Sequence, residues 1–209
     1  MIVQSMNRKE IFIEVNKDFE NVARKANYIL PKLRRNLVKS KKTELSYVYD
    51  YFSPRKNNWI VCLRVSKKGG IAISGYAYTK GFLDFYMPCV AGHNRLIHFT
   101  RHFAKRYRER FLKDEEIDLV SAMKEYILRN DQAMAFSAFD DPEKFVSKVI
   151  DGITLGTIEW IDDYTSLLRE NTFLSYDMLR NDQVDLAIDL HERLMKYKDE
   201  NKSFGFEKD

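Results

Sequence analysis

The sequence predicts an α+β protein: an antiparallel sheet built from two hairpins, with a long N-terminal helix, a central helix cluster and a C-terminal helix. Three observations lead to this class. Apolar residues recur every three or four positions along the N-terminal stretch, as in an amphipathic helix. Two pairs of β-rich runs each flank a short turn, as in hairpins. The chain has 209 residues, 44% of them hydrophobic, which favours one folded domain over residues 1–209.

The first expected element is a basic helix within residues 1–45. From residue 8 to residue 42 apolar side chains return at helical spacing, among them Phe12, Val15 and Phe19. Pro31 predicts a bend in this helix. Residues 24–42 carry eight Lys and Arg and no acidic residue. Such a basic stripe is more often solvated than functional.

The first hairpin follows a turn-rich break at residues 53–58. Residues 59–65 and 71–78 are rich in β-branched and aromatic side chains around a Gly-Gly turn, which predicts two paired strands. Residues 82–87 suggest a third strand. Residues 95–99 form a short strand that leads into a helix near Thr100, a residue type that caps helix N-termini.

The C-terminal half supplies further helices and the second hairpin. Apolar spacing predicts a helix over residues 115–128. Another is predicted over residues 142–150, with Asp140 or Asp141 as its cap and Pro142 in its first turn. The runs 153–161 and 165–174 flank a polar turn and predict the second hairpin. A last helix is expected over residues 176–197, and residues 196–209 form a polar, flexible tail.

The apolar pattern predicts a cytoplasmic protein that does not enter a membrane. No apolar run is long enough for a signal peptide or a membrane-spanning helix. Cys62 and Cys89 have no metal-ligand spacing and are too few for a disulfide framework, so they are predicted to be buried thiols. Trp59 and Trp160 are expected in the core.

The charges divide sharply along the chain. Residues 1–113 hold 24 Lys and Arg against 8 Asp and Glu, a net charge of +16, whereas residues 114–209 hold 11 against 23, a net charge of −12. A basic half of this kind indicates a polyanionic partner such as RNA. The alternative is that the acidic half packs against the basic half and neutralises it. The sequence leaves both interpretations open.

The densest cationic stretch is residues 98–111, which contain two of the four histidines and five Lys and Arg around one Glu. At about 100° per residue, His102, Arg106 and Arg110 form one row on the expected helix, beside an aromatic row at positions 103, 107 and 111. The aromatic row would anchor the helix to a sheet. The basic row would then lie at the edge of the buried face.

Histidine and arginine at such an edge suit phosphate chemistry. A histidine moves protons near neutral pH, and an arginine fork matches phosphate oxygens. We therefore take His102, Arg106 and Arg110 as the catalytic candidates for metal-independent RNA cleavage, in which a base and an acid act on the ribose and the leaving oxygen. The structural alternative is a helix whose arginines pair with acidic residues of the C-terminal half.

Five further residues are predicted to bind the substrate: His98, Arg101, Arg169, Thr172 and Ser175. The first two belong to the cationic stretch, and the other three are the polar residues of the second hairpin best placed to meet the helix. No metal or cofactor is expected. The spacing of His98 and His102 suits a shared metal only within one helix, and a cap at Thr100 would leave His98 outside it.

The pattern T-x-H-F-x-x-R-x-x-E-R over residues 100–110, followed by a helix with apolar residues at 117, 120 and 123, resembles a helix pair of toxin ribonucleases. These are the RelE-like and barnase/EndoU/colicin-type enzymes, and the resemblance covers about residues 95–130. It implies metal-independent RNA cleavage, an antitoxin-like acidic protein partner, and active-site roles for His102 and Arg106, with Arg110 on phosphate. In these families three or more consecutive strands follow the helices, whereas this sequence shows only one hairpin there.

Two function classes therefore stand: an RNA-directed protein, in its enzymatic form a metal-independent ribonuclease of toxin type, or a non-catalytic nucleic-acid-binding or protein-interaction module. Helix geometry separates them. With Phe103 and Tyr107 on the buried side, His102 is predicted to be more than half buried and hydrogen-bonded, while Arg108 points to solvent. An exposed His102 would lose the desolvation that favours a catalytic histidine.

Overall fold

The fold is an α+β arrangement of one large mixed sheet and three α-helices in the part of the chain that the structure describes. This computed structural model describes residues 1–88, 94–130, 134–138 and 141–180, together with positions 185, 188, 189 and 192. The expected helix over 176–197 opens with a 3-10 turn, Tyr176–Met178, and the rest of it falls almost entirely outside the described residues, as does the expected tail.

The sheet contains nine strands in the described residues. Their order across the sheet is β1 (Glu44–Phe52), β2 (Asn58–Ser66), β3 (Ile71–Tyr78), β4 (Phe85–Pro88), β5 (Arg95–Phe99), β9 (Thr165–Ser175), β8 (Gly152–Asp162), β7 (Asp141–Lys148) and β6 (Met134–Ala138). All neighbours pair antiparallel except β5 and β9, which run parallel. Both expected hairpins are present, as β2–β3 and β8–β9, but the sheet is much larger than these two hairpins.

Three elements differ from the sequence prediction, and the first is strand β6, where no element was expected. Strand β1 was missed, although tyrosines at positions 47, 49 and 51 alternate along it as a strand pattern requires. The predicted helix over 142–150 is wrong, because this segment is strand β7, paired with β6 and β8. A short run containing Phe145, Val146 and Val149 suits either structure, and only its strand neighbours settle the choice. The chain after the central helices is therefore a four-strand meander.

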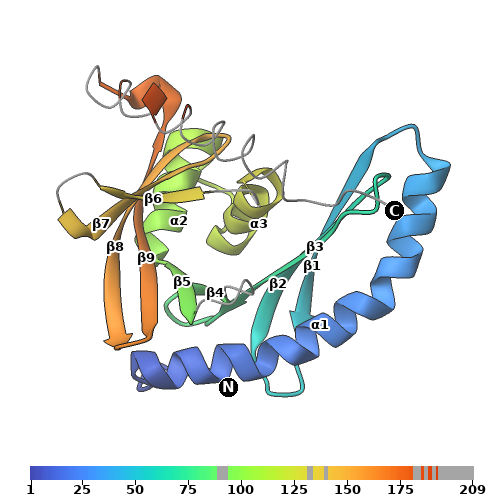
Figure 1. The fold of residues 1–209 in the computed structure, drawn as a ribbon, viewed down its shortest axis with the longest axis horizontal. Helices are drawn as coiled ribbons and strands as arrows, with labels where there is room; N and C mark the ends of the chain where they lie inside the picture. The colour runs from blue at the N-terminus through green and yellow to red at the C-terminus, as the bar shows by residue number, and fades with distance from the viewer. Residues whose placement is uncertain are drawn as a thin grey trace.

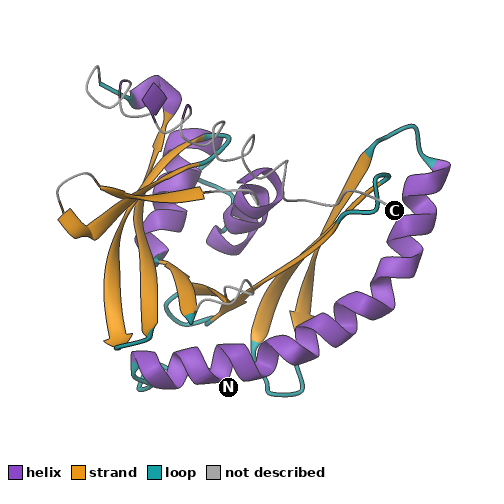
Figure 2. Cartoon of the chain, viewed as in Figure 1, coloured by secondary structure: helices purple, strands orange, loops and turns teal. Residues whose placement is uncertain are grey.

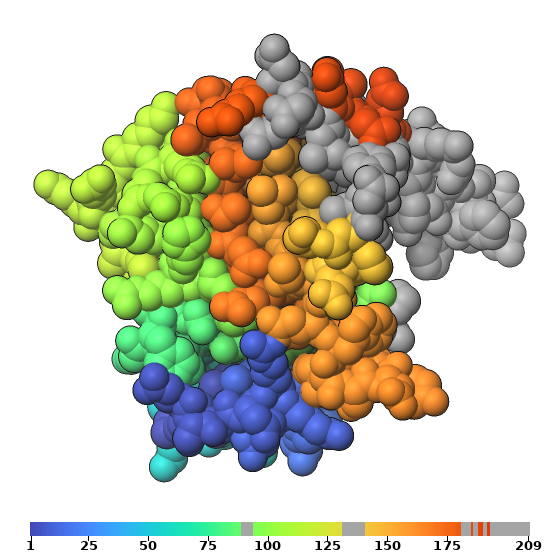
Figure 3. Space-filling view, turned by 90° about the vertical axis from the view of Figure 1, so that its left-hand side faces the viewer, coloured from blue at the N-terminus to red at the C-terminus, as the bar shows by residue number. Residues whose placement is uncertain are grey.

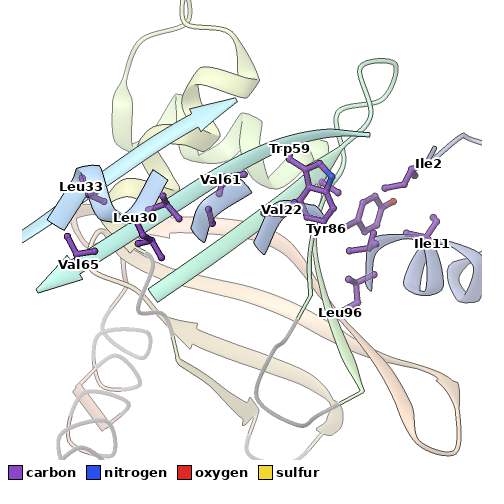
Figure 4. Packing of buried hydrophobic residues seen from close by; sticks show 14 of the residues in the cluster. Ile2, Ile11, Val22, Leu30, Leu33, Trp59, Val61, Val65, Tyr86 and Leu96 are labelled. Carbon is purple, nitrogen blue, oxygen red and sulfur yellow. The ribbon is translucent and has the colours of Figure 1, made fainter. Parts of the chain in front are cut away.

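Helix α1 (Arg8–Lys39) covers one face of the sheet. Asn7 caps it, with its side chain accepting from the Glu10 amide and the Glu10 carboxylate accepting from the Asn7 amide. Pro31 lies within the helix, and Figure 1 shows the helix curving along the sheet. Its apolar stripe meets β2, β4 and β5, as the labelled side chains of Figure 4 show.

Buried carboxylates anchor the N-terminal half of α1. Asp18 is fully buried and accepts hydrogen bonds from Ser53 Oγ and Asn57 Nδ2 at 2.6 Å and from Trp59 Nε1 at 2.9 Å. Arg8 pairs with Glu159 on β8 near the start of the helix. Figure 3 shows this blue end of α1 against the orange strands β8 and β9.

Helices α2 (Arg101–Tyr107) and α3 (Leu119–Asn130) lie on the opposite face, and Figure 2 shows the sheet curving around them. Strand β2 separates the two cores: Trp59 and Val61 face α1, whereas Ile60 and Cys62 face α2 and α3. The predicted burial of Trp59 and Cys62 is confirmed. The prediction for Trp160 is wrong, because its side chain is 66% exposed, and Cys89 lies outside the described residues.

The predicted cap of α2 is confirmed: Thr100 Oγ1 accepts a hydrogen bond from the Phe103 amide at 3.1 Å. Phe103 and Tyr107 are fully buried, as expected for the anchoring row. A π-helical turn, Arg108–Leu112, extends the helix. Among the described residues, no helix has both the length and the apolar composition needed to cross a membrane.

Candidate functional site

Two residues of the basic row, His102 and Arg106, lie on α2, and both are hydrogen-bonded locally. His102 is exposed, and its Nε2 accepts a hydrogen bond from Arg106 Nε at 3.3 Å. Arg106 Nη1 also donates to Glu109 Oε2 at 3.0 Å, and Lys105 Nζ lies 3.5 Å from Glu109 Oε1. Glu109 therefore offsets much of the positive charge that the sequence places here.

The predicted difference in burial between His102 and Arg108 is wrong, although the hydrogen bond of His102 is confirmed. His102 is exposed, whereas Arg108 is half-buried and donates from Nη1 to the Ile117 carbonyl at 3.1 Å. The chain entering α3 packs against the Arg108 side of α2 and leaves the His102 side open. Helix phase alone could not show on which side α3 would pack. The desolvation expected for a catalytic His102 is absent.

Arg110 points away from the other two residues, toward β9. Its Nη1 donates to the Phe173 carbonyl at 2.6 Å. Burial, and then the charge of Arg106, lower the pKa of Arg110. Arg110 and Ser175 line one hollow of about 350 Å³, so the structure brings these two predicted residues together. Arg106 and His102 are not among its lining residues.

Carboxylates occupy this hollow beside the cations. Asp151 accepts from Arg129 Nη2 at 2.7 Å, from Tyr107 Oη at 2.8 Å and from Asn130 Nδ2 at 2.8 Å. Asp177 pairs with Lys113 at 3.1 Å. An anion entering the hollow would have to displace these carboxylates from their partners, so the site is poorly suited to phosphate.

His98 lies in a second hollow, of about 370 Å³, between the start of α1 and strands β4 and β5. Its imidazole stacks on Tyr86 with ring centroids 4.7 Å apart, and its Nε2 lies 3.3 Å from Asp84 Oδ2. Burial raises the pKa of Asp84, but His98 and the Arg101 backbone amide outweigh this effect and hold it below its usual value. His98 is thus a buried histidine within ion-pair distance of an ionised carboxylate, although its Nε2 makes no well-aligned hydrogen bond among the described residues.

The remaining predicted residues, Arg169, Arg101 and Thr172, line neither hollow. Arg169 is the register partner of His98 on β9, and its Nη1 lies 3.5 Å from Glu159 Oε1. Arg101 is exposed, and only its backbone amide reaches Asp84, at 2.9 Å. Thr172 is half-buried opposite Leu155 on β8. The predicted site residues therefore do not converge on one concavity. No cluster of three or more metal-binding side chains occurs in the described residues.

The outer face of the C-terminal half of α1 differs from α2. All eight of its cations are exposed: Arg24, Lys25, Lys32, Arg34, Arg35, Lys39, Lys41 and Lys42. Within the described part of the chain, no carboxylate lies within ion-pair distance of any of them. We call these eight residues the basic face of α1.

A groove of about 600 Å³ adjoins this basic face. Residues 28–36 of α1 form one side of it, and Tyr47 of β1 forms the other. Lys32 and Arg35 lie among the α1 residues that line it, and none of the described residues that line it is acidic. Sequence reasoning missed this groove because it missed β1. The alternating tyrosines of residues 47–51 were the signal that could have revealed it.

The two oppositely charged halves meet only in part. Arg8 pairs with Glu159, Lys9 with Asp162 at 3.6 Å and Lys113 with Asp177 at 3.1 Å. In the described chain these ion pairs lie at the two ends of the basic half and do not reach residues 24–42. Mutual neutralisation, the alternative reading of the charge division, therefore applies to part of the surface.

Comparisons with protein-family models, with curated proteins and with solved structures find no match to this chain.

Proposed function

We propose that this protein binds RNA through the basic face of α1. The observation that carries the proposal is the row of exposed cations at residues 24–42, which has no carboxylate partner among the described residues. A cation that already has a carboxylate partner must lose it to bind phosphate, whereas these cations need only release counterions.

The spacing of these residues suits an extended polyanion. At about 100° per residue, Lys25, Lys32, Arg35 and Lys39 fall within an arc of roughly 80° on one side of α1. The row is about 21 Å long at 1.5 Å per residue, which along one strand of a duplex corresponds to about six phosphates. A nucleic-acid backbone can thus contact several cations of this row at once.

Fluorescence anisotropy with labelled RNA across a salt series tests this proposal. Wild-type protein should lose affinity steeply between 50 and 200 mM salt, by about a hundredfold or more if several phosphates are contacted. Replacing Lys32, Arg35 and Lys39 with Gln should lower the affinity more than tenfold and reduce the slope of log K against log salt by about 2.

The matched control removes three exposed cations elsewhere, with Lys17→Gln, Lys80→Gln and Lys105→Gln. This triple has the same net charge as the α1 triple, so it should change RNA affinity less than threefold if the location of the charge matters. Affinity that does not depend on salt would rule out the proposal. An equal loss in both triples would show non-specific attraction by net charge.

A second candidate is RNA cleavage, and two observations favour it. The helices α2 and α3 are followed by the four-strand meander β6–β9, the chain order that the resemblance to toxin ribonucleases implies. The second observation is the pairing of His98 with Asp84 in a hollow that Arg8 and Tyr86 also line. A carboxylate that orients an imidazole is a common arrangement for acid–base catalysis. This candidate assigns the acid–base role to His98 in place of His102.

Incubation of purified protein with labelled RNA in the presence of a chelator tests cleavage. Activity that His98→Asn removes and His102→Ala retains would support the His98 assignment. Activity with the opposite dependence would restore His102 as the catalytic residue. Intact RNA over a range of pH would leave binding alone, the non-catalytic function.

A further inference from the structure

We infer that the groove between α1 and β1 holds unpaired bases of single-stranded RNA, an inference that rests on the proposed RNA-binding function. The groove has a volume of about 600 Å³ and is lined by two tyrosines, Tyr28 and Tyr47, on opposite sides. This volume lies within the roughly 300–1,000 Å³ typical of sites that enclose small organic groups.

Tyr47 is placed to present a ring face to a ligand. It projects from β1 with 46% of its surface exposed and stacks on Tyr49, with ring centroids 5.3 Å apart and an interplanar angle of 22°. Tyr49 thus supports one face of the Tyr47 ring. Because Tyr47 lines the groove, a base that enters can continue this stack.

Tyr28 offers a second stacking surface on α1. Tyr28 is 81% exposed, so its ring is open to a ligand from the solvent. Lys25 Nζ lies 5.5 Å from the centroid of its ring, a cation–π contact that leaves a positive charge beside the ring. A base stacked on Tyr28 would therefore have its phosphate close to a cation.

The charges of the groove fit a nucleic-acid strand. Lys32 and Arg35 supply cations among its lining residues, Asn36 supplies an amide, and the part of the chain that the structure describes places no acidic side chain there. Arg35 Nε donates to the Pro31 carbonyl at 3.3 Å, which restrains the arginine on the helix. Cations beside aromatic rings are the arrangement that binds single strands without sequence preference.

Base pairing should decide which RNA binds best. In a duplex the ring faces of the bases are covered by their stacked neighbours, so Tyr28 and Tyr47 could not reach them. A duplex could use only the basic face. An acidic peptide would likewise use the cations and leave the rings without a stacking partner. Single-stranded RNA can use both features at once.

The test measures the affinity of the full chain for an unstructured 12-nucleotide RNA and for the same sequence in duplex form, at one salt concentration. The single strand should bind at least tenfold more tightly. Tyr47→Ala and Tyr28→Ala should each weaken single-strand binding about fivefold or more and duplex binding less than twofold. Tyr47→Phe should retain wild-type affinity, because a phenyl ring still stacks.

Tyr164→Ala is the control, since Tyr164 is 82% exposed in the turn between β8 and β9 and far along the sheet from β1. Circular dichroism of each variant confirms folding. Duplex binding equal to single-strand binding, or tyrosine variants that keep full affinity, would overturn the inference. If the Lys32, Arg35 and Lys39 triple still lost affinity in that case, the RNA-binding proposal would survive alone. Absence of any RNA binding would defeat both.

Discussion

The C-terminal half of α1 and the helix α2 are both basic, but they differ in whether their cations already have partners within the fold. On α2 and the π-helical turn that extends it, Arg106 is paired with Glu109, Arg108 with the Ile117 carbonyl and Arg110 with the Phe173 carbonyl. On α1, Lys32 and its basic neighbours are exposed and have no carboxylate partner among the described residues, and Arg35 bonds only to the Pro31 carbonyl of its own helix. The number of cations in a segment therefore does not measure the charge available to a ligand.

Packing explains the difference between the two helices. Helix α2 and the π-helical turn are short and pack against β9 and α3, so Arg108 and Arg110 of the turn reach backbone carbonyls outside their own helix. Helix α1 packs against the sheet through one stripe, and its anchoring carboxylates, Glu14 and Asp18, lie in its N-terminal half.

The largest expected effect is at Asp151, which lines the hollow beside Arg110, where the charges already have partners. Its side chain is 1% exposed and accepts hydrogen bonds from Arg129, Tyr107 and Asn130. Asp151→Ala would leave Arg129 and the buried Tyr107 hydroxyl without their acceptor, so it should destabilise the protein by about 3–5 kcal/mol in urea unfolding at pH 7. Asp177→Ala, at an exposed carboxylate, should change the free energy of unfolding far less, because exposed ion pairs contribute little. A loss below 1 kcal/mol at Asp151 would contradict the network.

Glu170 gives the next largest effect, through pH. It is buried on β9, accepts a hydrogen bond from Ser147 Oγ at 3.1 Å, and burial raises its pKa from 4.5 to about 7. The folded state favours the neutral form of Glu170. The contribution of Glu170 to the free energy of unfolding is therefore fully present below pH 4.5 and is lost as the pH rises to about 7. The loss amounts to about 3 kcal/mol.

Glu170→Gln removes this titration. Between pH 4.5 and 8 the free energy of unfolding of the variant should therefore fall less than that of the wild type, by the part that Glu170 contributes. Thermal unfolding of both proteins across this range provides the measurement. The variant should be the more stable protein at pH 8. Parallel pH curves for the two proteins would show that Glu170 titrates normally.

A smaller effect separates Arg108 from His102 on α2. Arg108→Ala removes the hydrogen bond to the Ile117 carbonyl and the packing of a half-buried side chain, which should cost about 1 kcal/mol. His102→Ala removes an exposed side chain and should cost less than about 0.5 kcal/mol. Urea unfolding compares the two variants directly. The reverse order would return His102 to the buried edge of α2.

The sequence predicted the elements whose signals are local. The long amphipathic pattern of α1, the Thr100 cap of α2 and the two hairpins depend on residues close together in the chain, and all are present. The prediction for strand β7 failed because Phe145 and Val146 are equally compatible with a helix. Only the pairing with β6 and β8 identifies the segment as a strand. The parallel pairing of β5 with β9 depends on contacts about 70 residues apart, and no local pattern encodes it.

The candidate site was harder to predict, because it depends on which charges remain available. Local spacing correctly placed His102 and Arg106 in one row, where they are hydrogen-bonded. It could not show that Arg110 would bind the Phe173 carbonyl or that Asp84 would pair with His98, since these partners come from other elements. The stripe over residues 24–42 looked like an ordinary solvated face for the same reason.

The smallest expected effect is on the stability contributed by the basic face of α1. Replacing Lys32, Arg35 and Lys39 of α1 with Gln should change the free energy of unfolding by less than about 0.5 kcal/mol. Two weak effects oppose each other. Removing like charges three or four residues apart relieves repulsion of about 0.2–0.5 kcal/mol per pair. Removing Lys39 from the last turn loses about 0.3–1 kcal/mol of favourable interaction with the helix dipole.

Urea unfolding at low and at high salt measures this difference, which should shrink further at high salt because both effects are screened. The same triple is expected to lower RNA affinity more than tenfold, so a variant of unchanged stability would lose binding. A destabilisation above 1 kcal/mol would mean that these cations make contacts within the fold. In that case α1 and α2 would be alike, and the charge of α1 would be no more available to RNA than that of α2.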